Sequence, residues 1–362
     1  GLTQSEFTQN PNDPFLITGM NFKDGQIRWD EVYHIKLKRY EEAKPIQLNP
    51  NDVLITKDGT IGKLLFVDEI PHPGKASLNS HLLVFRPINE QYDPKFLFYQ
   101  LSSKPFLEYI EKNKSGSTFF GITQTAIGNY NVYLPKKLEQ QKIAEVLSDT
   151  DKLVKQLENL ITKKKNIKQG AMQELLTGKR RLSGFSQELE IKELGKIVEI
   201  KKGQLITENT SINGNIPVIA GGKRPSYYHN KPNRFKKTIT ISASGAHAGF
   251  VSFHDYPIFA SDCSTIEEGE NYSIEYIHYQ LQRLQSKIYN LQTGGAQPHV
   301  HVNDLSPLEI FVPKNKDEQI VIAQILSDMD SEIQELEKKK DKYTKIKKGM
   351  MQKLLTGEIR LQ

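Results

Sequence analysis

Cysteine and long apolar runs are what this sequence has least of. Cys263 is the only cysteine, which excludes an intramolecular disulfide and a zinc site built from several cysteines. No apolar run approaches the roughly 20 residues that a membrane-spanning helix needs. The first five residues show neither the basic start nor the apolar core of a signal peptide. The sequence therefore predicts a protein of the reducing cytoplasm.

Recognisable catalytic and metal-binding motifs are also missing from the sequence. Gly221-Gly222-Lys223 lacks the spacing and the hydroxyl of a phosphate-binding loop, and no serine sits on a nucleophile turn. His299 and His301, with His229 and His247 elsewhere, are better explained as surface residues than as metal ligands, because no third ligand is placed beside them. We predict a recognition protein with no catalytic residue, metal or cofactor of its own. Catalysis through an unrecognised motif is the alternative.

Charge, by contrast, is plentiful and its balance is positive. The 362 residues are 37% hydrophobic and 25% charged, which suits a globular protein long enough for two domains. The formal charge of +6 and the isoelectric point near 9.0 favour a polyanionic partner, provided that the cations gather on one surface.

A charged segment at residues 138–177 recurs 179 positions later at residues 317–356. Leu147-Ser148-Asp149 falls on Leu326-Ser327-Asp328, and both copies end on Leu-Leu-Thr-Gly. Each copy opens with a proline and a Glu-Gln step, at Pro135 with Glu139-Gln140 and at Pro313 with Glu318-Gln319. Self-similarity of this length indicates a duplicated unit.

Both copies have the apolar three-four spacing of a helix that packs against another helix. About forty residues form a rod of roughly 60 Å, and a Lys/Glu-rich rod alone would be no more than a solvated spacer. Two matching copies favour an antiparallel pair instead. The predicted helix-pair core is Ile143, Leu147, Val154, Leu157, Ile161, Ile322, Leu326, Met329, Ile333, Leu336 and Tyr343, with Lys164 and Lys168 interrupting the first seam.

Two globular segments surround the helices, and they share a plan. We predict domains at 1–134 and 183–312, with the helix segments at 135–182 and 313–362. Each domain has two short strands around a glycine turn (52–55 and 64–67; 238–241 and 249–252), an aromatic helix (96–101; 276–281), a polar loop and a last strand (131–134; 309–312). The first domain lacks a counterpart of the opening strand within 190–200. Either the sequence is trimmed, which we favour, or another part of the chain fills that edge.

Cations interleaved with aromatic and amide side chains are suited to nucleic acid, because cations hold phosphates while Asn, Gln, Arg and His read base edges. Two such loops contain Tyr33, His34, Lys36, Lys38 and Arg39, and Lys223, Arg224, Tyr227, Tyr228, His229, Lys231, Arg234, Lys236 and Lys237. The glycine turns and late loops add Lys57, Thr60, Lys114, Ser115, Ser117, Thr118, Ser244, His247, Gln297, His299 and His301. Any one of them alone could be a solvated surface residue.

The whole arrangement resembles the DNA-specificity (S) subunit of type I restriction-modification systems. The resemblance implies an α+β fold with two target-recognition domains, each reading one half of a split double-stranded DNA site, separated by two long helices in an antiparallel coiled coil. It also implies two methylation subunits that use S-adenosylmethionine to methylate adenine N6. Restriction subunits that use ATP and Mg would join them. The family pattern places these cofactors on the partners.

Two other readings stay open. A scaffold whose coiled coil joins proteins would bind them without the steep salt dependence of DNA binding. A specificity subunit of a methylation-only system would have the same sequence features.

Overall fold

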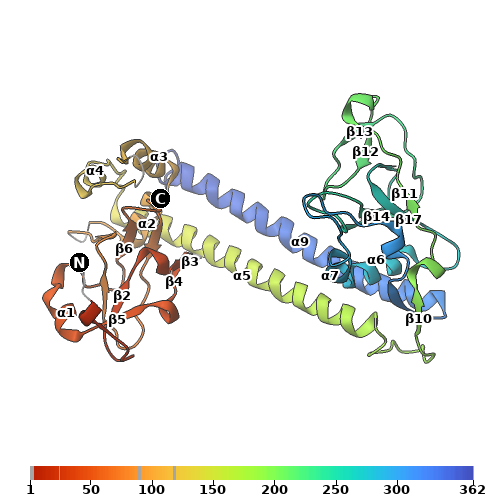
Figure 1. The fold of residues 1–362 in the computed structure, drawn as a ribbon. Coiled ribbons are helices and arrows are strands. Elements are labelled where there is room, and N and C mark those ends of the chain that lie inside the picture. Colours follow the sequence, from red (N-terminus) through yellow and green to blue (C-terminus); the bar gives the residue numbers. More distant parts are fainter. Residues whose placement is uncertain (1–3, 24, 89–90, 117–119, 362) are drawn as a thin grey trace. The chain divides into compact units, whose positions relative to one another are not determined.

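The computed structural model describes residues 4–23, 25–88, 91–116 and 120–361. The chain divides into two compact units (Figure 1). The first consists of Gly1–Leu157 with Lys339–Gln362, and the second of Glu158–Lys338. Each unit therefore holds one globular domain and one stretch of both long helices. The sequence-based domains end where the helices begin, whereas the compact units cut across them.

The first globular domain is built on a strand that is buried on both faces. On β6 (Val53–Thr56), Leu54 packs with Phe15 and Leu65, while Val53 and Ile55 pack with residues of the helices. Three antiparallel strands have the order β7-β6-β9, a four-stranded sheet has the order β1-β5-β2-β8, and β3-β4 is a hairpin. The other elements are β1 (Phe7–Thr8), β2 (Phe15–Ile17), β3 (Phe22–Lys23), β4 (Gln26–Ile27), β5 (Tyr33–Ile35), α1 (Leu37–Glu42), β7 (Leu64–Phe66), β8 (Ala76–Leu78), β9 (Leu82–Phe85), α2 (Pro94–Leu101), α3 (Lys104–Asn113) and α4 (Gln124–Gly128).

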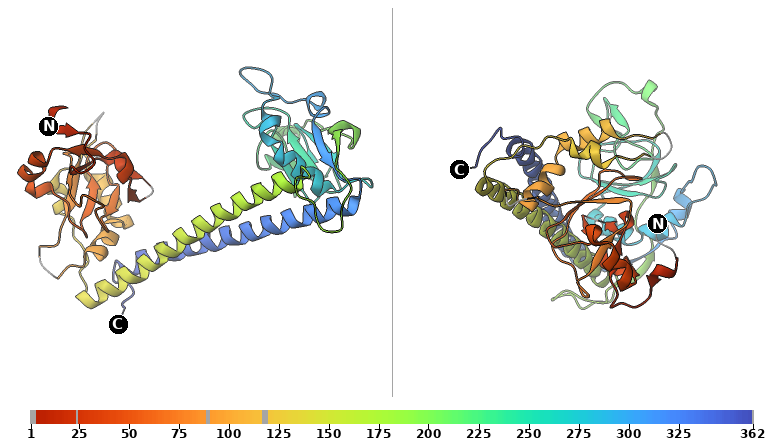
Figure 2. Two further views of the ribbon diagram at one scale, coloured as in Figure 1. Left: turned by 90° about the horizontal axis from the view of Figure 1, so that it is seen from below. Right: turned by 90° about the vertical axis from the view of Figure 1, so that its left-hand side faces the viewer.

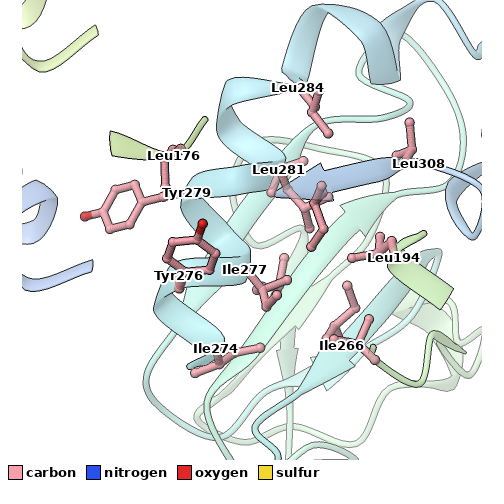
Figure 3. Packing of buried hydrophobic residues seen from close by; sticks show 14 of the residues in the cluster. Leu176, Leu194, Ile266, Ile274, Tyr276, Ile277, Tyr279, Leu281, Leu284 and Leu308 are labelled. Atoms are coloured by element: carbon pink, nitrogen blue, oxygen red, sulfur yellow. The ribbon is translucent and has the colours of Figure 1, made fainter. Parts of the chain in front are cut away.

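The second globular domain repeats this plan. Its sheets have the orders β11-β17-β14-β15, β13-β12-β16 and β10-β18. The elements are β10 (Glu190–Glu193), β11 (Lys201–Lys202), β12 (Ile216–Ile219), β13 (Tyr227–His229), β14 (Thr238–Ser242), β15 (Val251–His254), β16 (Phe259–Ala260), β17 (Cys263–Glu267), α6 (Ile274–Arg283), α7 (Gln285–Tyr289), α8 (Val302–Leu305) and β18 (Glu309–Val312). Figure 3 shows α6 presenting Ile277 and Leu281 toward Leu194, Ile266 and Leu308.

The central strand pairings of the two domains correspond. β6 pairs with β7 and β9 as β14 pairs with β15 and β17, and β2 lies parallel to β8 as β12 lies parallel to β16. One prediction is wrong: residues 131–134 form no strand, although β18 does so at the matching place. β18 pairs along its whole length with β10, and no described strand of the first domain corresponds to β10.

The two long helices form the predicted antiparallel coiled coil. They are α5 (Lys137–Leu175) and α9 (Lys316–Leu354), and Figures 1 and 2 both show them side by side. Each is followed, three residues after its last helical residue, by a glycine with positive φ, 73° at Gly178 and 76° at Gly357, a conformation that favours glycine. A Cβ at Gly357 would lie 2.6 Å from the Tyr133 ring, so that close approach also requires glycine.

The predicted seam contacts more than the opposite helix. Ile143 and Leu147 pack with Phe96 and Tyr99 of α2, and Ile322 and Leu326 join the core of the second domain. Leu157, Ile161 and Ile333 are also buried, while Val154, Met329, Leu336 and Tyr343 are half-buried.

The repeated motifs are joints that tie each domain to both helices. In the first unit Gln140 donates to Pro135 O at 2.8 Å and accepts from Asp93 N at 2.8 Å. Gln100 on α2 donates to Leu355 O, beyond the end of α9, at 2.7 Å. In the second unit Gln319 donates to Pro313 O at 3.1 Å and accepts from Ser273 N at 2.9 Å. Gln280 there donates to Leu176 O at 2.8 Å.

A carboxylate clamp completes each joint. Glu139 at the start of α5 binds Arg360 at 2.6 and 2.7 Å, and Glu318 at the start of α9 binds Arg181 at 2.8 Å. Both carboxylates are buried, and the Arg360 hydrogen bonds hold the pKa of Glu139 below its usual range. The sequence motifs recur because each buried polar group requires its partner.

A tyrosine, an aspartate and a lysine form a second duplicated contact. Tyr279 on α6 donates to Asp330 at 2.9 Å, and Lys168 binds Asp330 at 2.6 Å while lying 5.1 Å from the Tyr279 ring. The first unit has the same triad in Tyr99, Asp151 and Lys347. Lys168, which interrupts the apolar seam in sequence, thus has a defined partner.

Candidate nucleic-acid interface

In the first domain the glycine turn and the late loop form one surface. Gly59 N donates to Phe120 O at 3.2 Å, and Ile122 N donates to Lys57 O at 2.8 Å. Ser115 and Gly121 form a bridge inside the late loop. The result is a cleft of about 400 Å³ lined by Lys57, Asp58, Leu83, Ser115, Gly121, Ile122, Thr123 and Gln124. Two stretches about sixty residues apart in sequence therefore meet.

The second domain joins its turn and loop through the same backbone contacts. Gly245 N donates to Pro298 O at 3.0 Å, and Val300 N donates to Ala243 O at 3.0 Å. The rings of His299 and His301 stack with centroids 6.1 Å apart. A cleft of about 360 Å³ lies nearby, lined by Ile219, Gly222, Lys223, Arg224, Pro225, Val251, Ser252, Phe253, His254, Tyr256, His278 and Gln282.

Seven of the candidate cations form no ion pair with a residue that the structure describes. They are Lys36, Lys38, Lys57, Lys223, Arg224, Lys231 and Lys236. Lys223 lies over the Phe250 ring at 5.4 Å. Lys38 lies in α1 rather than in the predicted loop, and the other six lie between regular elements. Unpaired cations are available to neutralise phosphates.

Other candidate cations are engaged inside their domains. Arg234 lies between Glu267 at 3.5 Å, Thr265 at 3.0 Å and the Lys202 carbonyl at 3.0 Å. Lys237 binds Glu275 at 2.6 Å, and that hydrogen bond raises the pKa of the ammonium. Arg39 and Lys114 pair with Glu6 and Glu111. These residues stabilise the loops, and their contact with nucleic acid stays a prediction.

The aromatic candidates divide in the same way. Tyr33 and Tyr228 are more than half exposed, whereas the Tyr227 hydroxyl donates to Ile206 O at 2.6 Å. His34 contacts Asp13 O at 2.8 Å, and Ile212 N donates to His229 at 3.1 Å. Thr60, Gln297 and His301 are exposed and His247 is half-buried. Ser117 and Thr118 lie outside the described residues.

A family model for the type I restriction modification DNA specificity domain matches residues 2–169 and again residues 186–347. The chain belongs to this family. Each globular domain with its following helix is thus one copy of a DNA specificity domain, and the chain is a specificity subunit in this family.

Similar proteins agree with the family match. A Methanocaldococcus jannaschii protein named as the type I restriction enzyme MjaVIII specificity subunit is 25% identical, over 88% of this chain and 81% of its own length. The specificity subunit of a type I restriction-modification system from M. genitalium has the same fold, with a TM-score of 0.69, 18% identity and coverage of 98% of this chain and 91% of its own. A structure from a study of type I complex assembly and conformational transition matches with a TM-score of 0.58, 15% identity and coverage of 98% and 95%.

The second specificity domain holds a buried histidine pair that sequence reasoning missed. His254 and His278 line its cleft, and burial lowers the pKa of each to about 4. At the corresponding backbone positions the first specificity domain has Val67 and Phe98. His254 ends strand β15 and His278 lies in helix α6, and nothing in the sequence marks the two histidines as buried.

Among residues 4–23, 25–88, 91–116 and 120–361, no group of three or more His, Cys, Asp or Glu side chains could hold a metal ion. Over the same residues, every helix is too short or too polar to cross a membrane.

Proposed function

We propose that this chain directs a type I restriction-modification complex to a bipartite, asymmetric DNA site whose gap is set by the helix pair. One observation carries the proposal. The two domains repeat topology, joints and loop-to-loop backbone contacts, but they fill the contact loops with different residues. Equivalent surfaces with different chemistry would read two different half-sites.

The unpaired cations and the joined loops have separate roles in this proposal. Lys223 and Arg224, and Lys57 with Lys36 and Lys38, hold phosphates and fix the register of each domain on the duplex. The joined turn and loop present side chains that read base edges. Because the joints tie each domain to both helices, the reading surface is held rigidly on the coiled coil.

The chain is proposed to act without chemistry of its own, in the cytoplasm, on double-stranded DNA. Two methylation subunits with S-adenosylmethionine and the restriction subunits with ATP and Mg would supply catalysis. The family membership and the absence of recognisable catalytic motifs support this division of labour. A specificity subunit for a methylation-only system, or a protein-binding scaffold, is an outcome that the following tests would reveal.

Mapping of N6-methyladenine in the source cell, with and without this gene, tests the proposal. We expect one asymmetric, gapped motif to lose its methylation when the gene is removed. If no motif changes, binding of the purified chain to a mixed DNA pool at several salt concentrations distinguishes a DNA-binding protein from a scaffold. DNA binding weakens steeply with salt. Salt-independent association would favour the scaffold.

The slope of that salt dependence tests the phosphate contacts. With up to seven free cations engaged, log Kd should change with log salt by a slope of roughly 3 to 6. Replacing Lys223 and Arg224 with alanine should lower the slope by about 2. Lys342→Ala on α9 is the matched control, since it removes a lysine of the helix pair and should leave the slope unchanged. Equal slopes in all three proteins would contradict the assignment.

A further inference from the structure

The reading surface of each domain is the surface formed by its joined glycine turn and late loop. It contains a third loop, the turn between β8 and β9 in the first domain and between β16 and β17 in the second. In the first domain Lys57 N donates to the carbonyl of His81, just before β9, at 3.0 Å. In the second, Ala243 N donates to the carbonyl of Asp262, just before β17, at 3.2 Å. His81 and Asp262 therefore occupy equivalent positions beside the two glycine turns.

A side-chain pair bridges the two turns at this place in both domains. His81 Nδ1 lies 2.8 Å from Asp58 Oδ1. In the second domain the hydroxyl of Ser244 donates to Asp262 Oδ2. Asp58 and Ser244 correspond, because each precedes the turn glycine that donates to the late loop. The carboxylate thus stands on the glycine turn in one domain and on the opposite turn in the other.

Both carboxylates lie close to the cations that are proposed to bind phosphates. Asp58 lines the cleft next to Lys57, and its side chain is 19% exposed. Asp262 lies beside the loop that begins at Gly221, since Ser242 donates to Gly221 O at 3.0 Å and a Cβ on Gly221 would lie 3.7 Å from Asp262 Oδ2. That loop continues into Lys223 and Arg224. A carboxylate on a surface that binds phosphates repels them and so weakens DNA binding. It can compensate for that repulsion if it accepts a hydrogen bond from a base.

One oxygen of each carboxylate is left for such a contact. Asp58 Oδ2 and Asp262 Oδ1 have no hydrogen bond to a residue that the structure describes. Carboxylates accept from exocyclic amino groups, as Asp and Glu do from cytosine N4 in the major groove. His81 and Ser244 hold the other oxygen, so each carboxylate is already oriented before DNA arrives.

We propose that Asp58 and Asp262 are specificity-determining residues, each accepting a hydrogen bond from the exocyclic amino group of a cytosine or adenine in the half-site of its own domain. His81 and Ser244 act as positioning residues. The inference rests on the proposed function, and it adds that one base position in each half-site carries an amino group that an aspartate reads.

Methylation mapping of cells that express Asp58→Asn or Asp262→Asn in place of the natural chain tests this inference. The amide can donate as well as accept, so bases with keto groups become acceptable. We expect one position of one half-site to become degenerate, with discrimination there reduced about tenfold. Asp262→Asn should affect the other half-site. Asp68→Asn, at the far end of β7, removes an exposed carboxylate and should leave the motif unchanged.

A structural role would give a different pattern. If either variant lowers the unfolding temperature and methylates fewer copies of an unchanged motif, the pair only braces the turns and the inference is wrong. A variant that fails to accumulate counts against the inference for its domain in the same way, and the other variant decides its own domain independently. Failure of the proposed function is separate, since the natural chain would then show no motif at all.

Discussion

The two specificity domains share the residues that join them to the helices and differ in the side chains of their proposed reading surfaces. Their carboxylate clamps coincide at an offset of 179 positions, as in Glu139 with Arg360 against Glu318 with Arg181, and Gln100 and Tyr99 at the joints recur 180 positions later as Gln280 and Tyr279. The loops joined at the reading surface coincide only in their backbone hydrogen bonds. The joint side chains are thus largely repeated between the two domains, whereas those of the joined loops differ.

Exchange of a whole domain should have the largest effect on the DNA site that is recognised. Replacing residues 183–312 with the corresponding segment of another specificity subunit should exchange one half-site completely and leave the other intact. The joints need only Gln280, Ser273 and Tyr279 from the exchanged segment, so these three should be kept. Methylation mapping reads out both half-sites. A change in both would mean that the domains do not read independently.

Lengthening the helix pair should change the gap alone. Seven residues inserted after Glu158 in α5 and seven after Lys339 in α9 add about 10.5 Å, close to three base pairs at roughly 3.4 Å each, and a heptad nearly preserves the seam. We expect a gap about three base pairs longer with both half-sites unchanged. The same insertion in only one helix is the control, because the Lys168–Asp330 and Asp151–Lys347 pairs on the two sides of the insertion could then no longer both keep their register. An unchanged gap would refute the idea of a ruler.

Acid should destabilise the second domain more than the first. His254 and His278 have pKa values of about 4 when folded, below the 6.5 of an exposed histidine. The unfolded chain therefore binds more protons, so this stability is complete above pH 6.5 and falls as the pH drops toward 4. Between pH 7 and pH 5 each histidine should cost about 2 kcal/mol.

The first domain supplies the matched variant for this test. It has Val67 and Phe98 at the two positions, so His254→Val with His278→Phe should reduce the acid sensitivity of the second domain. Hydrogen exchange at pH 5 and pH 7, followed separately in α2 and α6, measures the difference. Equal losses in the natural and substituted chains would exclude the histidines as the cause.

The sequence allowed most of the scaffold to be predicted, and the reason lies in its duplication. A 179-residue offset exposed the helices and the joint motifs, and the short strands followed from their glycine turns. The strand predicted at 131–134 does not form, because strand formation at the matching residues 309–312 depends on the partner β10, a tertiary contact that a local apolar run does not reveal.

The reading surface was only partly predictable. Basic composition located the free lysines, but the same composition also selected Arg234 and Lys237, whose carboxylate partners lie about 30 to 40 residues away in sequence. Asp58 and Asp262 were not among the predicted contacts, because those were chosen for positive charge or for amide, aromatic and hydroxyl groups. Only the fold places them at the joined loops.

The two carboxylate clamps offer the smallest and most local contrast. Glu318 is more deeply buried than Glu139, with side chains 2% and 8% exposed, and Arg181 is less exposed than Arg360, at 24% against 56%. A carboxylate that loses its arginine regains water more easily where it is less buried. Arg181→Met should therefore destabilise the chain by about 2 kcal/mol, and Arg360→Met by less. Urea midpoints of the two variants, compared with the natural chain, measure both losses. Equal losses would mean that burial of the carboxylate does not set the strength of the joint, and that the two domains are held on the coiled coil equally firmly.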